Sequence, residues 1–227
     1  MPLQVERRLA QEWAAGEGPT TLCNREPLTY VEERNLLSIK EHTVANEWGP
    51  LAGLAGDWES DRGGLDTAYS HSLGKVLETP YQERCTFKPF GPVDNGDQHL
   101  YGLDYKTAMW RGDEDNPFHT EVGYWLWDGA SGEVLRAFVV PRGIAVLAGG
   151  FTTEDATEFT LRAAKDEPLY SIGENQYLAK NASSLRYEVT ISVDDTSWSY
   201  QETTILRMNE FVEPFPHTDH NTLRRVG

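Results

Sequence analysis

Two of the six histidines in this chain of 227 residues lie close together near its C-terminus, within Pro216–Val226, and a third, His119, lies within Phe118–Trp125. Imidazole is a common ligand of metals and of haem iron. Both runs have the composition of β-strands. Together they predict a β-barrel with a pocket lined by histidines.

His217 is the candidate metal ligand, and the competing interpretation is a surface histidine on a polar terminal strand. His119 and Glu121 are two residues apart and would share one face of a strand. Such a pair could bind a small metal or transfer a proton, or it could be a buried polar pair satisfied by neighbouring strands. One imidazole and one carboxylate are too few for a closed metal site, so we expect His119 to line a cavity.

Two further residues are candidates for ligand contact. Arg142 follows Pro141 at a predicted corner between strands, where its guanidinium could pair with a propionate or a fatty-acid carboxylate, or simply be solvated. Trp58 could offer aromatic surface to a flat ligand, although aromatic side chains also fill ordinary barrel cores.

The elements that must position these residues are short strands separated by turn signals. Within Ser184–Val193, apolar and polar residues alternate, which requires one buried face and one wet face, and a turn at Asp194 leads into a second strand up to Leu206. Similar patterns predict strands near 82–90, 98–111, 118–128, 133–140, 143–149 and 157–164, with irregular connections at 61–80 and 165–183. We therefore expect an all-β fold, an antiparallel up-and-down closed barrel of about ten strands, calycin-like.

The first 48 residues differ in pattern from the rest. Val5–Ala15 and Glu32–Asn46 have helical spacing and good helix formers. We predict an N-terminal helical extension over 1–48 and a barrel domain over 49–227. The extension could cap the barrel or form a subunit contact in a homodimer.

Composition excludes some partners. A formal net charge of −16 argues against binding to nucleic acid or to anionic membrane, both of which need clustered basic residues. The absence of a leader pattern and of a long apolar run predicts a cytoplasmic protein. Cys23 and Cys85 have no metal-ligand spacing, so we expect reduced thiols.

Three segments, Leu54–Glu59, Phe118–Tyr124 and Pro216–His217, together resemble the nitrobindin family, also described as fatty-acid-binding-protein-like or THAP4-like haem-binding β-barrels. The resemblance covers roughly residues 49–226. It implies a ten-stranded barrel that binds haem b through one histidine on the last strand, binds nitric oxide at ferric iron and isomerises peroxynitrite to nitrate. It implies that His217 is the axial ligand and that His119 and Trp58 match a cavity histidine and a strand-opening tryptophan.

The chain departs from the family pattern at two places. The glycines that usually follow the strand-opening tryptophan are missing or displaced. His217 lies one residue farther from the terminal basic pair than the family ligand, which would turn it outward unless a bulge restores its direction, and His220 would then face the opposite way. Two functions remain open at this point: ferric-haem chemistry with nitric oxide or peroxynitrite, or non-catalytic carriage of a fatty acid or other lipophile, with Arg142 meeting the carboxylate.

Overall fold

The computed structural model describes residues 47–226, so the two predicted N-terminal helices, in residues 1–46, lie outside the described part of the chain. The elements are η1 (Gly49–Leu54), β1 (Gly56–Ser60), β2 (Gly64–Ser70), β3 (Lys75–Asn95), β4 (Gln98–Trp110), β5 (His119–Asp128), β6 (Glu133–Val140), β7 (Ile144–Phe151), β8 (Glu158–Ala164), β9 (Ile172–Glu174), α3 (Gln176–Asn181), β10 (Ala182–Val193), β11 (Ser197–Met208) and β12 (Phe215–Arg225).

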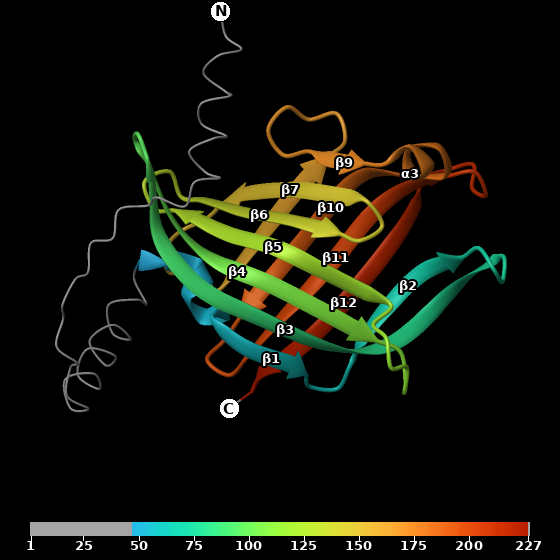
Figure 1. Cartoon of the computed structure of the whole chain (residues 1–227), viewed down its shortest axis with the longest axis horizontal. Helices are drawn as coiled ribbons and strands as arrows, with labels where there is room; N and C mark the ends of the chain where they lie inside the picture. The colour runs from blue at the N-terminus through green and yellow to red at the C-terminus, as the bar shows by residue number, and fades with distance from the viewer. Residues whose placement is uncertain (1–46, 227) are drawn as a thin grey trace, which may run out of the picture. The chain divides into compact units, whose positions relative to one another are not determined.

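The strands close into one antiparallel barrel (Figure 1). β1 and β2 both pair with β3 on one side and β12 on the other, so they form one barrel strand interrupted at residues 61–63. With β1 and β2 counted together and β9 attached outside the ring to β7, the barrel has ten strands, as expected from the sequence. The region 61–80 is the exception, because it contains β2 and a hairpin with β3 rather than an irregular connection.

The barrel is least regular where β7 meets β8. These strands share a single paired position, Gly149 with Arg162. Beyond it β7 pairs with β9 instead, from Ile144 to Val146. The helix α3 follows, and its first turn is capped by Asn175, whose side chain accepts a hydrogen bond from the Leu178 amide at 3.0 Å. The predicted irregular connection at 165–183 therefore contains a short strand and a helix that line this seam.

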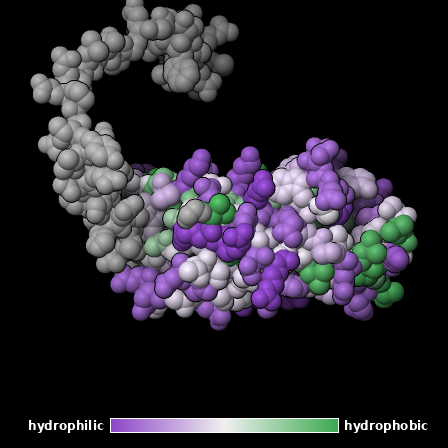
Figure 2. Space-filling view, turned by 90° about the horizontal axis from the view of Figure 1, so that it is seen from below, coloured by the Kyte–Doolittle hydropathy of each residue, from purple (hydrophilic) through white to green (hydrophobic). Residues whose placement is uncertain are grey.

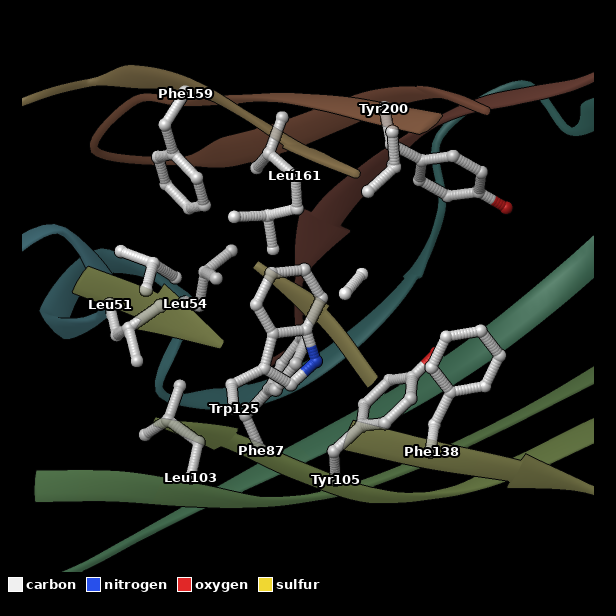
Figure 3. Packing of buried hydrophobic residues seen from close by; sticks show 14 of the residues in the cluster. Leu51, Leu54, Phe87, Leu103, Tyr105, Trp125, Phe138, Phe159, Leu161 and Tyr200 are labelled. Atoms are coloured by element: carbon white, nitrogen blue, oxygen red, sulfur yellow. The ribbon is translucent and has the colours of Figure 1, made fainter. Parts of the chain in front are cut away.

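A hydrophobic cluster fills one end of the barrel. The helix η1 contributes Leu51 and Leu54, which are fully buried. They face the barrel end occupied by Leu103, Phe159 and Leu161, while Tyr105, Phe138 and Tyr200 lie toward the other end (Figure 3). The two ends thus differ, one packed with aliphatic side chains and the other lined by aromatic and polar ones.

Strand alternation directs His217 into the barrel. Pairing between β11 and β12 runs without a register shift from Phe215 to Arg224. His217 lies on the same face as the buried Phe215 and Asn221, whereas His220 is exposed on the opposite face. The inward direction of His217 therefore needs no bulge.

The outer surface seen in Figure 2 is mainly hydrophilic, in keeping with the net charge, with hydrophobic side chains gathered near the end where the β2–β3 hairpin lies. Leu73 and Val76 are exposed on this hairpin. None of the helices in residues 47–226 has the length and apolarity needed to cross a bilayer.

Candidate functional site

The end of the barrel opposite η1 contains two adjacent cavities of about 240 Å³ and 140 Å³. Both are lined by one set of mostly polar side chains: His119, Glu121, Arg142, Glu202, Thr204 and His217. The larger cavity extends over charged and aromatic residues. The smaller one is largely apolar, lined by Phe138, Val140, Ile144, Val146, Ile172, Leu178 and Leu206.

Arg136 on β6 is buried beneath the larger cavity. Its guanidinium donates to Glu121 at 2.6 Å, to Glu202 at 2.9 Å and to the Tyr105 hydroxyl at 3.0 Å, and it also contacts the Tyr187 hydroxyl. These partners come from β4, β5, β10 and β11. We call these five residues the Arg136 cluster. It places fixed charges where a barrel of this size could otherwise hold an apolar ligand.

The Arg136 cluster keeps its charges despite burial. Desolvation alone would raise the pKa of Glu121, but Arg136 and His119 together lower it to about 2. Burial lowers the pKa of Arg136, while the surrounding tyrosines and carboxylates raise it well above its usual value. Both groups are therefore ionised at neutral pH, which agrees with the rule that buried charges occur in pairs.

A second polar group surrounds Glu83 on β3. Its carboxyl accepts hydrogen bonds from Thr107 at 2.6 Å, Tyr200 at 2.9 Å and Asn221 at 2.9 Å. Burial raises the pKa of Glu83, and these three donors offset only part of that shift.

Asp219, two residues after His217 on the inward face of β12, contacts the Tyr81 hydroxyl. Desolvation, together with the negative charges of Glu202, Glu83 and Asp66, raises the pKa of Asp219 to about 8. This carboxyl is therefore mostly protonated at neutral pH. It lines the larger cavity, so it presents a neutral acid to any ligand there.

Each of the two inward histidines is paired with a carboxyl group. Nε2 of His217 lies 2.6 Å from Oδ1 of Asp66, and Nε2 of His119 lies 3.1 Å from Oε1 of Glu121. Burial lowers the pKa of His119, but Glu121, Glu202 and Asp219 together raise it more, so the net shift is upward. His119 and Glu121 thus share one face of β5, as expected, and both histidines line both cavities.

The other two candidate residues lie in different places. Arg142 is exposed in the β6–β7 turn, at the rim of both cavities. Trp58 lines neither cavity: it is buried, its Nε1 donates to the Leu54 carbonyl at 2.7 Å, and the Arg225 guanidinium lies 4.2 Å from its ring centroid. Its surroundings are those of a core residue.

Sequence reasoning missed Arg136, Glu202, Asp66 and Asp219. A signal existed for two of them. Arg136 lies two residues from both Val134 and Phe138, so alternation places it on the same face as these two buried residues. Asp219 lies two residues after His217 and therefore shares its face. The partners of these residues lie on distant strands, and local pattern does not reveal them.

Within residues 47–226, no three His, Cys, Asp or Glu side chains form a group that could hold a metal ion.

Residues 47–225 match the profile of the family described as "THAP4-like, heme-binding beta-barrel domain". Among solved structures, the chain is similar to Rv2717c from M. tuberculosis, with a TM-score of 0.53 and 18% sequence identity over 78% of this chain and 95% of that one. At this identity the likeness concerns the fold. No curated protein matches the chain by sequence.

Proposed function

The chain belongs to the THAP4-like haem-binding β-barrel domains, the nitrobindin family, and from that membership we propose that it binds a small molecule at the open end of its barrel. The ligand we propose is a compact amphipathic organic molecule rather than haem. The observation that carries this proposal is the division of the site into a charged cavity of about 240 Å³ and an apolar one of about 140 Å³.

The residues at the open end do not fit a haem. The Nε2 of His217 is hydrogen-bonded to Asp66, which leaves only its Nδ1 free to meet an iron. Each cavity is smaller than the roughly 300–1,000 Å³ of ordinary small-molecule sites, and a porphyrin is larger than most such ligands. Glu202, the most exposed member of the Arg136 cluster, would also lie against an apolar macrocycle, where its carboxylate would lose its remaining solvent contact without gaining a partner.

Ferric-haem chemistry with nitric oxide or peroxynitrite is therefore the competing hypothesis. What favours it is that His217 and His119 both face the same space. It would require either that Nδ1 of His217 reach the iron or that Asp66 release Nε2, and it would require the Arg136 cluster to rearrange; we derive no reaction step from it.

A long fatty acid is also a poor fit. An acyl chain needs an extended apolar cavity, because each buried methylene gains about 0.8 kcal/mol only where its surroundings are apolar. The apolar cavity here, between Phe138 and Leu206, has room for a short or cyclic group. We therefore place the apolar part of the ligand there and its polar part over the charged cavity.

Acetophenone is a suitable probe, since it joins a carbonyl to a flat apolar ring. Saturation-transfer NMR should detect its binding to the wild-type protein. Thr204 lines both cavities, so Thr204→Trp should fill the space between them and weaken binding at least about tenfold, by steric exclusion.

Thr203→Trp is the matched control, because Thr203 lines a groove elsewhere on the barrel and neither of these cavities. It should leave acetophenone binding unchanged. Equal binding by both variants, with both folded by circular dichroism, would place the ligand elsewhere and overturn the proposal.

A further inference from the structure

Three buried nitrogen atoms have no hydrogen-bond partner among the described residues, and all three belong to side chains that line the larger cavity: Trp125 Nε1, Trp198 Nε1 and Arg136 Nε. All three side chains are more than nine-tenths buried. All three atoms carry a hydrogen and can only donate. Figure 3 shows the Trp125 nitrogen on the edge of the indole that faces Tyr105 and Tyr200.

Buried donors without partners are uncommon, since each costs about 1–3 kcal/mol. Here three of them belong to side chains that line the same cavity. Trp48 and Trp58 show the contrast: their indole nitrogens donate to backbone carbonyls at 2.8 Å and 2.7 Å. The unmatched donors therefore indicate that an acceptor group from outside the chain belongs in the cavity.

The charges around the donors restrict what that acceptor is. Arg136 is already bonded to two carboxylates, Glu121 and Glu202. An anionic ligand would meet these charges at close range without a free cation on the floor of the cavity. The cations Arg111 and Arg142 are exposed at the rim, where solvent screens them. An ammonium ligand would suit the carboxylates but would leave the indole donors unpaired.

We propose that the ligand is a neutral molecule bearing a carbonyl-type acceptor oxygen, which the indole N–H groups of Trp125 and Trp198 hydrogen-bond. This inference rests on the proposed function and adds the chemical class of the ligand. Its flat apolar part lies in the smaller cavity. Its oxygen points toward the packed end of the barrel.

Four matched probes test this class: acetophenone (neutral, with acceptor), ethylbenzene (neutral, without acceptor), benzoate (anion) and benzylammonium (cation). Calorimetric or NMR titration should give acetophenone the highest affinity, about 5- to 100-fold above ethylbenzene, the range of two net hydrogen bonds. Acetophenone should also shift the indole N–H resonances of Trp125 and Trp198 downfield.

Trp125→Phe and Trp198→Phe remove one donor each and keep an aromatic ring. Either should lower the affinity for acetophenone about 2- to 10-fold and leave that for ethylbenzene nearly unchanged, so that loss of folding and loss of the hydrogen bond are told apart. Trp110→Phe is the control, since Trp110 lies outside both cavities. It should change neither affinity.

The outcomes separate the two proposals. If all four probes bind equally well and Thr204→Trp abolishes their binding, the site is real but its donors hold only water, and the ligand class is wrong. Preference for benzoate or benzylammonium would also overturn the ligand class. If no probe binds, both the ligand class and the proposed function are wrong.

Discussion

The Nε2 atom of His217 on β12 lies 2.6 Å from the Oδ1 atom of Asp66 on β2, 151 positions away in the sequence. The two strands are paired through Thr218 with Thr67 and Asp219 with Asp66, which brings the side chains together. A carboxylate oxygen accepts, so this contact assigns the proton to Nε2 and leaves Nδ1 as the free nitrogen. Asp66 thus occupies one of the two ring nitrogens through which His217 could meet a ligand.

The first prediction concerns this tautomer. Neutral His217 should carry its proton on Nε2, as seen in long-range ¹H–¹⁵N NMR correlations of the imidazole. Asp66→Ala removes the acceptor and should shift the population toward a mixture of tautomers. His220, which is exposed, serves as the internal control and should not respond. A wild-type spectrum dominated by Nδ1–H would contradict the assigned contact.

Replacing Arg136 should destabilise the protein strongly. Arg136→Met leaves Glu121 and Glu202 without their shared cation, and removing one partner of a buried pair costs about 3–5 kcal/mol. Urea unfolding measures the loss. Arg162→Met is the control, because the pair of Arg162 with Glu188 is exposed and should contribute less than about 1 kcal/mol. Similar losses in both variants would mean that the Arg136 cluster does not stabilise the interior.

Asp219 should make stability fall as pH rises. Its pKa of about 8 in the folded protein is above the ordinary value of 3.8, so between these values the folded state binds more protons than the unfolded state. By linkage the free energy of unfolding then decreases with pH, by up to about 1.4 kcal/mol per pH unit for one proton.

Asp219→Asn cannot titrate and should lack this slope between pH 4 and 8 in urea unfolding experiments. The exposed Asp113→Asn should retain it. If Asp219→Asn and the wild-type protein lose stability in parallel over this range, Asp219 has an ordinary pKa.

The glycine two residues after Glu121 should be intolerant of a side chain. A Cβ at Gly123 would lie 2.0 Å from the Ala137 carbonyl oxygen on β6. Gly123→Ala should therefore force β5 away from β6 and cost about 1–3 kcal/mol or more. Gly129→Ala, whose Cβ would have its nearest neighbour at 3.4 Å, should change stability by less than about 0.5 kcal/mol. Unfolding experiments that give equal costs would contradict this reason for the glycine.

The barrel could be predicted from sequence because the alternation of apolar and polar residues along a strand is a local pattern. The strand predicted at Ser184–Val193 is found as β10, and its predicted hairpin partner is found as β11. It also predicted that His119 and Glu121 share a face, and it left open whether His217 or His220 faces inward. The register of β12 on β11 decided between them, and register is a long-range property.

The charged interior could not be predicted in the same way. Alternation along β6 places Arg136 on the buried face with Val134 and Phe138, but local sequence does not reveal the carboxylates that pair with it. Glu121 and Glu202 lie 15 and 66 positions away. The short strand β9 was missed for a related reason. In a simple β-meander β7 would pair along its length with β8, but here part of β7 pairs with β9, and local sequence does not reveal this change of partner.

The measurement that tests the central claim most directly is an absorbance titration of the purified protein with hemin, performed beside His217→Ala. We predict no saturable Soret shift that depends on His217, since Asp66 engages its Nε2 and the Arg136 cluster occupies the interior. A saturable shift at one hemin per chain, lost in His217→Ala, would contradict this account and assign the cavity to haem.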